Sequence, residues 1–378
     1  MQIRLNFKSS NHSPPVPTLV GTGLLALDVL LSDERTMMYS ALGGSAGNVL
    51  AILAHLGWSV TPVASLGHDA AAKRIYHEFK ELHADTRFLA YDAHQHTPVV
   101  YQLPKGGDVT HKFSFTCPFC GVRRGFSAPE EDTLSDVVLK NADAPSVFYF
   151  DRVVPWALEL AEKYRAQGTV VMFEPSIVGD DLDAFQRAIN AAHVLKYADD
   201  RIDDLQGFSR DSVELEVQTR GKHGLQFRFQ CSTSDASWQE LPAFVVPHLA
   251  DTAGAGDWCS AGFLFALIGS VAENGGKGLM STRRVKESLR FGQILAALNC
   301  MQVGARGLAR LYDRDHIVST AAAIRNEHTA PRISDHFTEM YGEDNSHTVN
   351  RMWDCSFASP TNETGAEKLT PWLCCQSF

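Results

Sequence analysis

The 378-residue sequence lacks long apolar runs, a dense set of cysteines and an excess of basic charge. No stretch of about 18 apolar residues occurs, so we expect no membrane-spanning helix. The N-terminal segment lacks the apolar core that a signal peptide carries. The net charge of −10 argues against nucleic acid as the main partner, because neutralising a phosphate backbone needs a basic surface. The eight scattered cysteines do not form a disulfide framework, which favours a reducing cytoplasm.

Short apolar segments with strand character alternate with segments whose apolar residues follow helical spacing. This alternation favours an α/β fold with a mostly parallel sheet that helices cover on both faces. The patterns predict a buried first strand over 18–31, a helix over 48–57, a hairpin over 98–115, a helical stretch near Asp203 and a long helix that opens near Gly254.

Two short motifs precede predicted helices and are suited to binding a ligand. In "GGSAGN" (43–48) the glycines let backbone amides approach a ligand, and Asn48 can cap the helix or bond a hydroxyl. In "DTAGAGD" (251–257) small residues lead into a helix start, which offers free N–H groups and the positive end of a dipole. Asp257 would repel an anion there, unless it takes a proton from the group that attacks that anion.

Together the motifs resemble the two signatures of the ribokinase-like, PfkB-type carbohydrate kinases. The first matches in the spacing of Asn48, Gly57 and Gly67, and it departs at Leu50 and Ala72. The second matches from "DTAGAGD" through "WCSAGFL", and the order of elements agrees over about 20–307. The resemblance implies a three-layer αβα sandwich with a mostly parallel central sheet and a small β lid.

The resemblance also suggests how the chain is divided. Residues 1–330 would form the kinase domain, with lid elements around 28–42 and 98–116. Residues 331–378 are polar and irregular and would form a C-terminal appendage of uncertain order.

The implied reaction transfers the γ-phosphoryl group of ATP, with Mg²⁺, to a hydroxyl of a sugar or sugar-containing metabolite. Asp257 would accept the hydroxyl proton, and an anion hole would be formed by the amides of Ala253, Gly254, Ala255 and Gly256. The acceptor would be bound by Asp28, Gly44 and Asn48. The nucleotide would contact Thr219, Gly221, Gly224 and Asn299, with Gly304 bordering the adenine.

One segment departs from the family pattern. Ala198 and Arg201 stand where an Asn-x-x-Glu motif is expected, which leaves open which residues organise Mg²⁺. Carboxylates suit this ion, but a solvated acidic stretch is the interpretation that we favour for most of Asp199, Asp200, Asp203 and Asp204. Glu174 keeps the acid of the family's Asp-Pro-Asn.

Several alternatives stay open. The acceptor is a sugar or a nucleoside, or the chain is a non-catalytic relative that binds a nucleotide or sugar. A Rossmann oxidoreductase is set aside, because "GTGLLALD" lacks the third glycine of the fingerprint. Lids of this family often meet across a twofold axis, so a homodimer could join two Cys117/Cys120 pairs around one Zn²⁺. We favour two ordinary thiols in a turn, and a solvated basic pair at Arg123 and Arg124.

Overall fold

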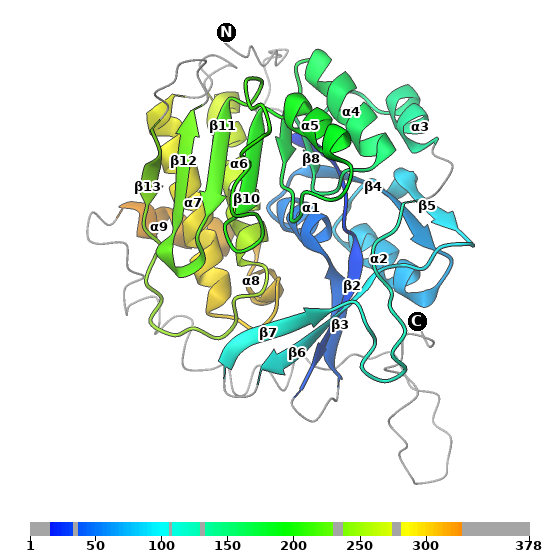
Figure 1. Cartoon of the computed structure of the whole chain (residues 1–378). Coiled ribbons are helices and arrows are strands. Elements are labelled where there is room, and N and C mark those ends of the chain that lie inside the picture. Colours follow the sequence, from blue (N-terminus) through cyan, green and yellow to red (C-terminus); the bar gives the residue numbers. More distant parts are fainter. Residues whose placement is uncertain are drawn as a thin grey trace.

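A large mixed sheet runs through the centre of the molecule (Figure 1). The structure, a computed structural model, describes residues 16–32, 37–105, 108–128, 133–229, 237–273 and 281–326. In these ranges its strands are β1 (Thr18–Thr22), β4 (Ser59–Gly67), β5 (Leu89–Asp92), β8 (Val147–Phe150), β9 (Val170–Phe173), β10 (Val194–Ala198), β11 (Leu215–Thr219), β12 (Leu225–Phe229) and β13 (Gln239–Leu241). Their order is β13-β12-β11-β10-β9-β8-β1-β4-β5. Neighbours from β5 to β11 are parallel, and β12 and β13 are antiparallel additions.

The central strands are apolar on both faces and therefore need two helical layers. In β8, Val147 and Tyr149 join one apolar cluster, whereas Phe148 and Phe150 join the other. The first cluster packs against α1 (Ser45–His55), α2 (Ala70–Glu81), α6 (Ala255–Glu273), α7 (Thr282–Cys300), α8 (Gly307–Leu311) and α9 (Arg314–Asn326). The second packs against α3 (Leu134–Asn141), α4 (Pro155–Ala166) and α5 (Leu182–Ala191). The predicted three-layer α/β architecture is confirmed.

A second, four-stranded sheet projects from the core (Figure 1). Its order is β3-β2-β6-β7, with β2 (Ala26–Leu31), β3 (Met37–Gly43), β6 (Val99–Lys105) and β7 (Asp108–Ser114). We call this sheet the lid. β6 and β7 form the predicted antiparallel hairpin, whose expected turn at residues 106–107 lies outside the described residues.

The prediction of one strand over 18–31 is wrong, because the chain changes sheet there. It leaves β1 at Gly23, whose φ is 134°, and then enters the lid as β2. A Cβ at Gly23 would lie 1.7 Å from Asp151 Oδ1, so only glycine allows the break. Asp28 therefore belongs to the lid and not to the first core strand.

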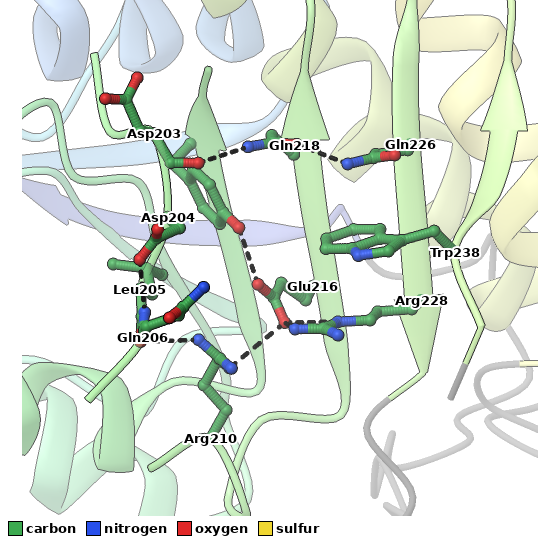
Figure 2. A pocket seen from close by; sticks show the side chains of 11 residues that line it. Asp203, Asp204, Leu205, Gln206, Arg210, Glu216, Gln218, Gln226, Arg228 and Trp238 are labelled. Atoms are coloured by element: carbon green, nitrogen blue, oxygen red, sulfur yellow. Dashed lines mark hydrogen bonds and ion pairs between the residues drawn. The ribbon is translucent and has the colours of Figure 1, made fainter. Parts of the chain in front are cut away.

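The predicted helical stretch near Asp203 is also wrong, since only turns and coil connect β10 to β11. In β11, Leu215 and Val217 point into the core, whereas Glu216 and Gln218 point to the opposite face of the sheet. A helix packed on that opposite face would therefore find no apolar surface. On that face Glu216 forms ion pairs with Arg228 (2.7 Å) and Arg210 (3.6 Å), as Figure 2 shows. A polar cavity of about 300 Å³ remains at this surface.

None of the helices in the described ranges is long and apolar enough to cross a membrane. The predicted appendage, residues 331–378, lies outside those ranges.

A buried ion pair connects the lid to the core. Asp69 caps α2 by accepting the amide of Ala72 (2.9 Å), and its second oxygen accepts the amide of Thr97 (3.0 Å) and pairs with Arg124. Arg124 is 5% exposed, so the prediction of a solvated basic pair is wrong for this residue. It holds for Arg123, which is exposed and lies over the ring of Phe115.

We expect Arg124→Met to lower the free energy of unfolding by about 3–5 kcal/mol, because it leaves the partly buried carboxylate of Asp69 without its cation. The adjacent Arg123→Met is the matched control and should cost less than about 0.5 kcal/mol. Urea unfolding monitored by circular dichroism measures both. Equal losses in the two variants would contradict a structural ion pair at Arg124.

Candidate active site

The two glycine-rich motifs meet at the starts of α1 and α6, which lie side by side. Asn48, in the first turn of α1, donates from Nδ2 to Asp257 Oδ2 at 2.8 Å. Asp257 lies in the first turn of α6 and is a partly exposed residue. The fold thus joins residues that are 209 positions apart in the sequence.

The surroundings of Asp257 favour its protonated form. Burial raises the pKa of its carboxyl well above the ordinary value, and the negative charge of Glu174 raises it further. The hydrogen bond from Asn48 and the positive charge of Lys196 act in the opposite direction. A raised pKa makes the ionised carboxylate a stronger proton acceptor than an ordinary aspartate, which suits a general base.

The loop before α6 has the open backbone of an anion site. Gly254 has a φ of 73°, and a Cβ on it would lie 2.3 Å from Ala305 O, so glycine is required. A Cβ at Gly256 would meet nothing within 4 Å. Among the described residues no acceptor takes the amides of Gly254, Gly256 or Asp257. These three N–H groups at a helix start suit an anion.

Two of the amides predicted for the anion hole have protein acceptors instead. Ala253 donates to Asp251 Oδ1 at 2.9 Å, and Ala255 donates to Thr252 O at 3.3 Å. Of the four predicted amides, those of Gly254 and Gly256 are without an acceptor among the described residues, as is the amide of Asp257.

The buried side chain of Asn299 bonds to the loop that precedes α6 and is not exposed to a nucleotide. It is fully buried, its Nδ2 donates to Ala253 O and Gly304 O, and its Oδ1 accepts the amide of Leu308. Because its amide group is fully bonded within the protein, the prediction of direct cofactor contact is corrected to a structural role.

The lid brings Asp28 next to the first motif. Its Oδ1 accepts the amide of Gly44 at 3.3 Å, and its Oδ2 accepts Nε2 of Gln102 at 3.1 Å. Burial raises the pKa of Asp28 to about 7, against the opposing charge of Arg306. Gln102 carried no sequence signal, since a lone glutamine in a hairpin strand is ordinary.

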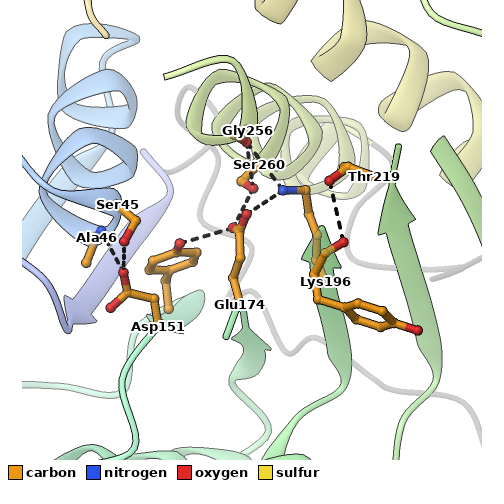
Figure 3. Close-up of polar contacts among 10 residues, drawn as sticks. Ser45, Ala46, Asp151, Glu174, Lys196, Thr219, Gly256 and Ser260 are labelled. Carbon is orange, nitrogen blue, oxygen red and sulfur yellow. Dashed lines mark hydrogen bonds and ion pairs between the residues drawn. The ribbon is translucent and has the colours of Figure 1, made fainter. Parts of the chain in front are cut away.

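The start of α1 is held by an acid that the sequence analysis did not single out. The N-cap residue Gly44 offers no side chain, and Asp151, which follows β8, takes that role. It accepts the hydroxyl of Ser45 and the amide of Ala46 (3.1 Å), as Figure 3 shows. This contact fixes the helix turn that carries Asn48.

The predicted nucleotide turn follows β11, at the sheet edge where the parallel strands end. Thr219 bonds to Tyr197 O at 3.4 Å. Gly221 (φ 51°) has open space around it, whereas a Cβ at Gly224 (φ 93°) would lie 2.1 Å from Leu241 O. Gly221 is therefore accessible to a ligand, and Gly224 is needed for packing.

The altered segment after β10 forms no metal site of its own. Asp203 and Asp204 line the polar cavity on the sheet face (Figure 2). Within the described ranges no group of three or more His, Cys, Asp or Glu side chains could hold a metal ion. Cys117 is buried in the apolar cluster of the lid and Cys120 is exposed, which favours two thiols in a turn over half of a Zn²⁺ site.

Comparisons with known proteins identify relatives. Residues 31–311 match the model described as pfkB family carbohydrate kinase. No curated protein matches the sequence. Among solved structures, an uncharacterized sugar kinase from Pyrococcus horikoshii is similar at 20% identity and a TM-score of 0.59, over 80% of this chain and 97% of that one. Fructokinase from Xylella fastidiosa with bound ATP is similar at 18% identity and a TM-score of 0.61, over 80% and 97%.

A third similar structure is a nucleoside kinase from Burkholderia thailandensis in complex with inosine. It shares 18% identity with this chain at a TM-score of 0.58, over 84% of this chain and 100% of that one. At such identities the likeness shows a common fold, which is the ribokinase-like fold that the two motifs predicted.

We expect Asp28→Asn to stabilise the protein at pH 8. The folded-state pKa of about 7 lies above the ordinary 3.8, so stability is lost as the pH rises from about 4 to about 7, and the full loss is present above pH 7. The gain should reach at most about 4 kcal/mol at about 1.4 kcal/mol per pKa unit, and should shrink as the pH falls from 7 towards 4. Thermal unfolding from pH 4 to 8 measures it, with the exposed Asp180→Asn as control. A gain independent of pH would rule out this cause.

Proposed function

Because the chain belongs to the pfkB family of carbohydrate kinases, we propose that it transfers the γ-phosphoryl group of ATP to a hydroxyl of a sugar or sugar-containing metabolite. The observation that carries the proposal is the contact between Asn48 and Asp257 (2.8 Å) beside the unbonded amides of the α6 start. It supports a proton acceptor beside an anion site, which is the pairing that phosphoryl transfer to an alcohol requires.

In the proposed reaction Asp257 accepts the proton of the attacking hydroxyl. The amides of Gly254, Gly256 and Asp257 bind the transferred phosphoryl oxygens and offset their charge, helped by the dipole of α6. Positioning and charge stabilisation account for most of the rate in this class of reaction.

Two buried amide oxygens support a polyhydroxylated acceptor. Asn48 Oδ1 and Gln102 Oε1 have no hydrogen-bond partner among the described residues. Leaving such an acceptor unbonded costs about 1–3 kcal/mol, and a donor from a ligand would remove that cost. Both belong to side chains that bond Asp257 or Asp28, the carboxylates proposed to act on the acceptor.

ATP and Mg²⁺ are the proposed cofactors. Gly221 at the turn after β11 is open to the nucleotide. Mg²⁺ commonly binds through phosphates, water and one or two carboxylates, so the lack of a converging acidic group in the described ranges is compatible with an ion that enters with ATP. Asp199 and Asp200, directly after β10, are two of the acids at that edge of the sheet. We further propose a cytoplasmic location, and a homodimer formed through the lid.

Two other functions remain as outcomes of the test. A nucleoside acceptor would use the same base and the same anion site. A non-catalytic relative that binds nucleotide or sugar is favoured by Ala198 and Arg201, which replace the ends of the family's Asn-x-x-Glu.

We expect the protein to release ADP from ATP and Mg²⁺ in the presence of at least one pentose, hexose or nucleoside. Asp257→Asn should lower kcat by about 10²–10⁴-fold, because it removes the proton acceptor and leaves the shape of the site unchanged. The exposed Asp183→Asn, on α5, is the control and should leave the rate unchanged. A coupled assay for ADP measures all three proteins.

Each outcome decides between the candidates. Turnover with nucleosides alone would select the nucleoside kinase. ATP binding measured by calorimetry, without turnover on any acceptor, would favour the non-catalytic relative and overturn the proposed activity.

A further inference from the structure

A buried ion pair lies under the first turn of α6, beside the proposed base. Lys196 projects from β10 and is 2% exposed, and it pairs with Glu174, which follows β9 (Figure 3). Burial by itself lowers the pKa of Lys196, but the charge of Glu174, its hydrogen bond and the charges of Cys259 and Asp257 together outweigh burial and raise that pKa, so Lys196 stays charged. A buried lysine that remains a cation needs such a partner.

The pair is bonded to the helix start that carries Asp257. Lys196 Nζ lies 3.4 Å from Gly256 O, and the hydroxyl of Ser260 lies 3.1 Å from the same oxygen and 2.5 Å from Glu174 Oε2. The hydroxyl of Tyr149 donates to Glu174 at 3.0 Å. Gly254 and Gly256 lie at the start of α6, and glycine restricts the backbone less than any other residue. Contacts from the sheet therefore help to fix the first turn of this helix.

The position of Lys196 in its strand relates it to the altered segment. Residues 196 and 198 lie on the same face of β10, because side chains alternate along a strand. Ala198 has no polar group to offer there. Lys196, one position earlier on that face, is the charged side chain that β10 directs towards α6.

We propose that Glu174 and Lys196 are positioning residues for the kinase centre: they hold the first turn of α6, and Lys196 offsets the charge of Glu174 next to Asp257. The inference rests on the proposed function in taking Asp257 as the base. Without Lys196, the carboxylate of Glu174 would repel both the ionised base and the phosphates of ATP.

The charges that act on Asp257 come from several elements. Glu174 after β9 and Asp151 after β8 raise its pKa in addition to burial, whereas Asn48 on α1 and Lys196 on β10 lower it. Tyr149 on β8 and Cys259 on α6 are the other titratable groups of this cluster, and burial raises the pKa of both. Changing one member of the ion pair should therefore move the titration of Asp257 in a direction set by the charge removed.

The test is a ¹³C NMR titration of the Asp257 carboxyl in aspartate-labelled protein, with the resonance assigned by its loss in Asp257→Asn. We expect Glu174→Gln to move the midpoint to lower pH and Lys196→Met to move it to higher pH, each by about one unit. The double variant should return towards the wild-type value. Arg228→Met is the matched control, because it removes a cation from another buried acid, Glu216, and should leave the midpoint unchanged.

The titration needs no turnover, so it separates the two proposals. Opposite shifts without activity on any acceptor would support the ion pair and overturn the kinase. Activity with no shift in any variant would overturn the positioning role alone. If Lys196→Met does not fold, the comparison of Glu174→Gln with the double variant still measures the effect of Lys196. An equal shift in Arg228→Met would show a general effect of losing a cation and would also overturn the inference.

Discussion

One hydrogen bond, from Asn48 to Asp257, joins the two halves of the proposed active centre, and much of the surrounding structure holds its ends. On one side Asp151 fixes the start of α1 by accepting from Ser45 and Ala46. On the other side Asp251 is a buried brace that accepts the amides of Ala253 and Gly304. Because Asn48 and Asp257 are 209 positions apart in the chain, tertiary contacts such as these hold the two helix starts in place. The acids of the site thus divide into supports, Asp151 and Asp251, and the proposed reacting group, Asp257.

Acidic side chains gather where the parallel strands end, and this concentration governs the electrostatics of the site. Burial raises the pKa of both Asp28 and Asp257, but their partners differ. Asp28 accepts two neutral donors, Gly44 and Gln102, which makes it suited to bonding a hydroxyl. Asp257 lies beside a carboxylate and an ammonium group, which makes it suited to exchanging a proton. Similar residues therefore acquire different roles from their neighbours.

The sequence predicted the fold class, the hairpin and the long helix at Gly254 because these depend on local patterns: apolar spacing, glycine turns and a helix start. It also placed Asn48 and Asp257 in one site, but only through two motifs read together. The apolar pattern did not divide 18–31 between two sheets, although the resemblance put a lid element around 28–42, since the break depends on the distant Asp151 lying against Gly23. Arg124 was misjudged for the same reason, because its partner Asp69 lies 55 residues away.

The polar members of the site were the least predictable. Lys196 stands in an apolar strand segment, "VLKYA", and nothing local shows that Glu174 neutralises it. Asn299 has a side-chain amide that could bind a ligand. Its Nδ2 and its Oδ1 instead form hydrogen bonds inside the protein. Whether a buried polar group is free for a ligand depends on tertiary contacts that a motif does not encode.

No helix in the described ranges covers the polar face of β11 and β12, on which Glu216 and Arg228 lie, and this has a consequence for the cooperativity of unfolding. Strands in the middle of the sheet lose apolar contacts on two sides when they separate, whereas these outer strands lose them mainly on the side of the first cluster. Local opening at this end of the sheet therefore costs less free energy than opening at β8 or β9. Backbone amides of β12 and β13 should exchange with solvent deuterium well before those of β8 and β9. The proposed nucleotide turn, between β11 and β12, therefore lies where the sheet opens most easily.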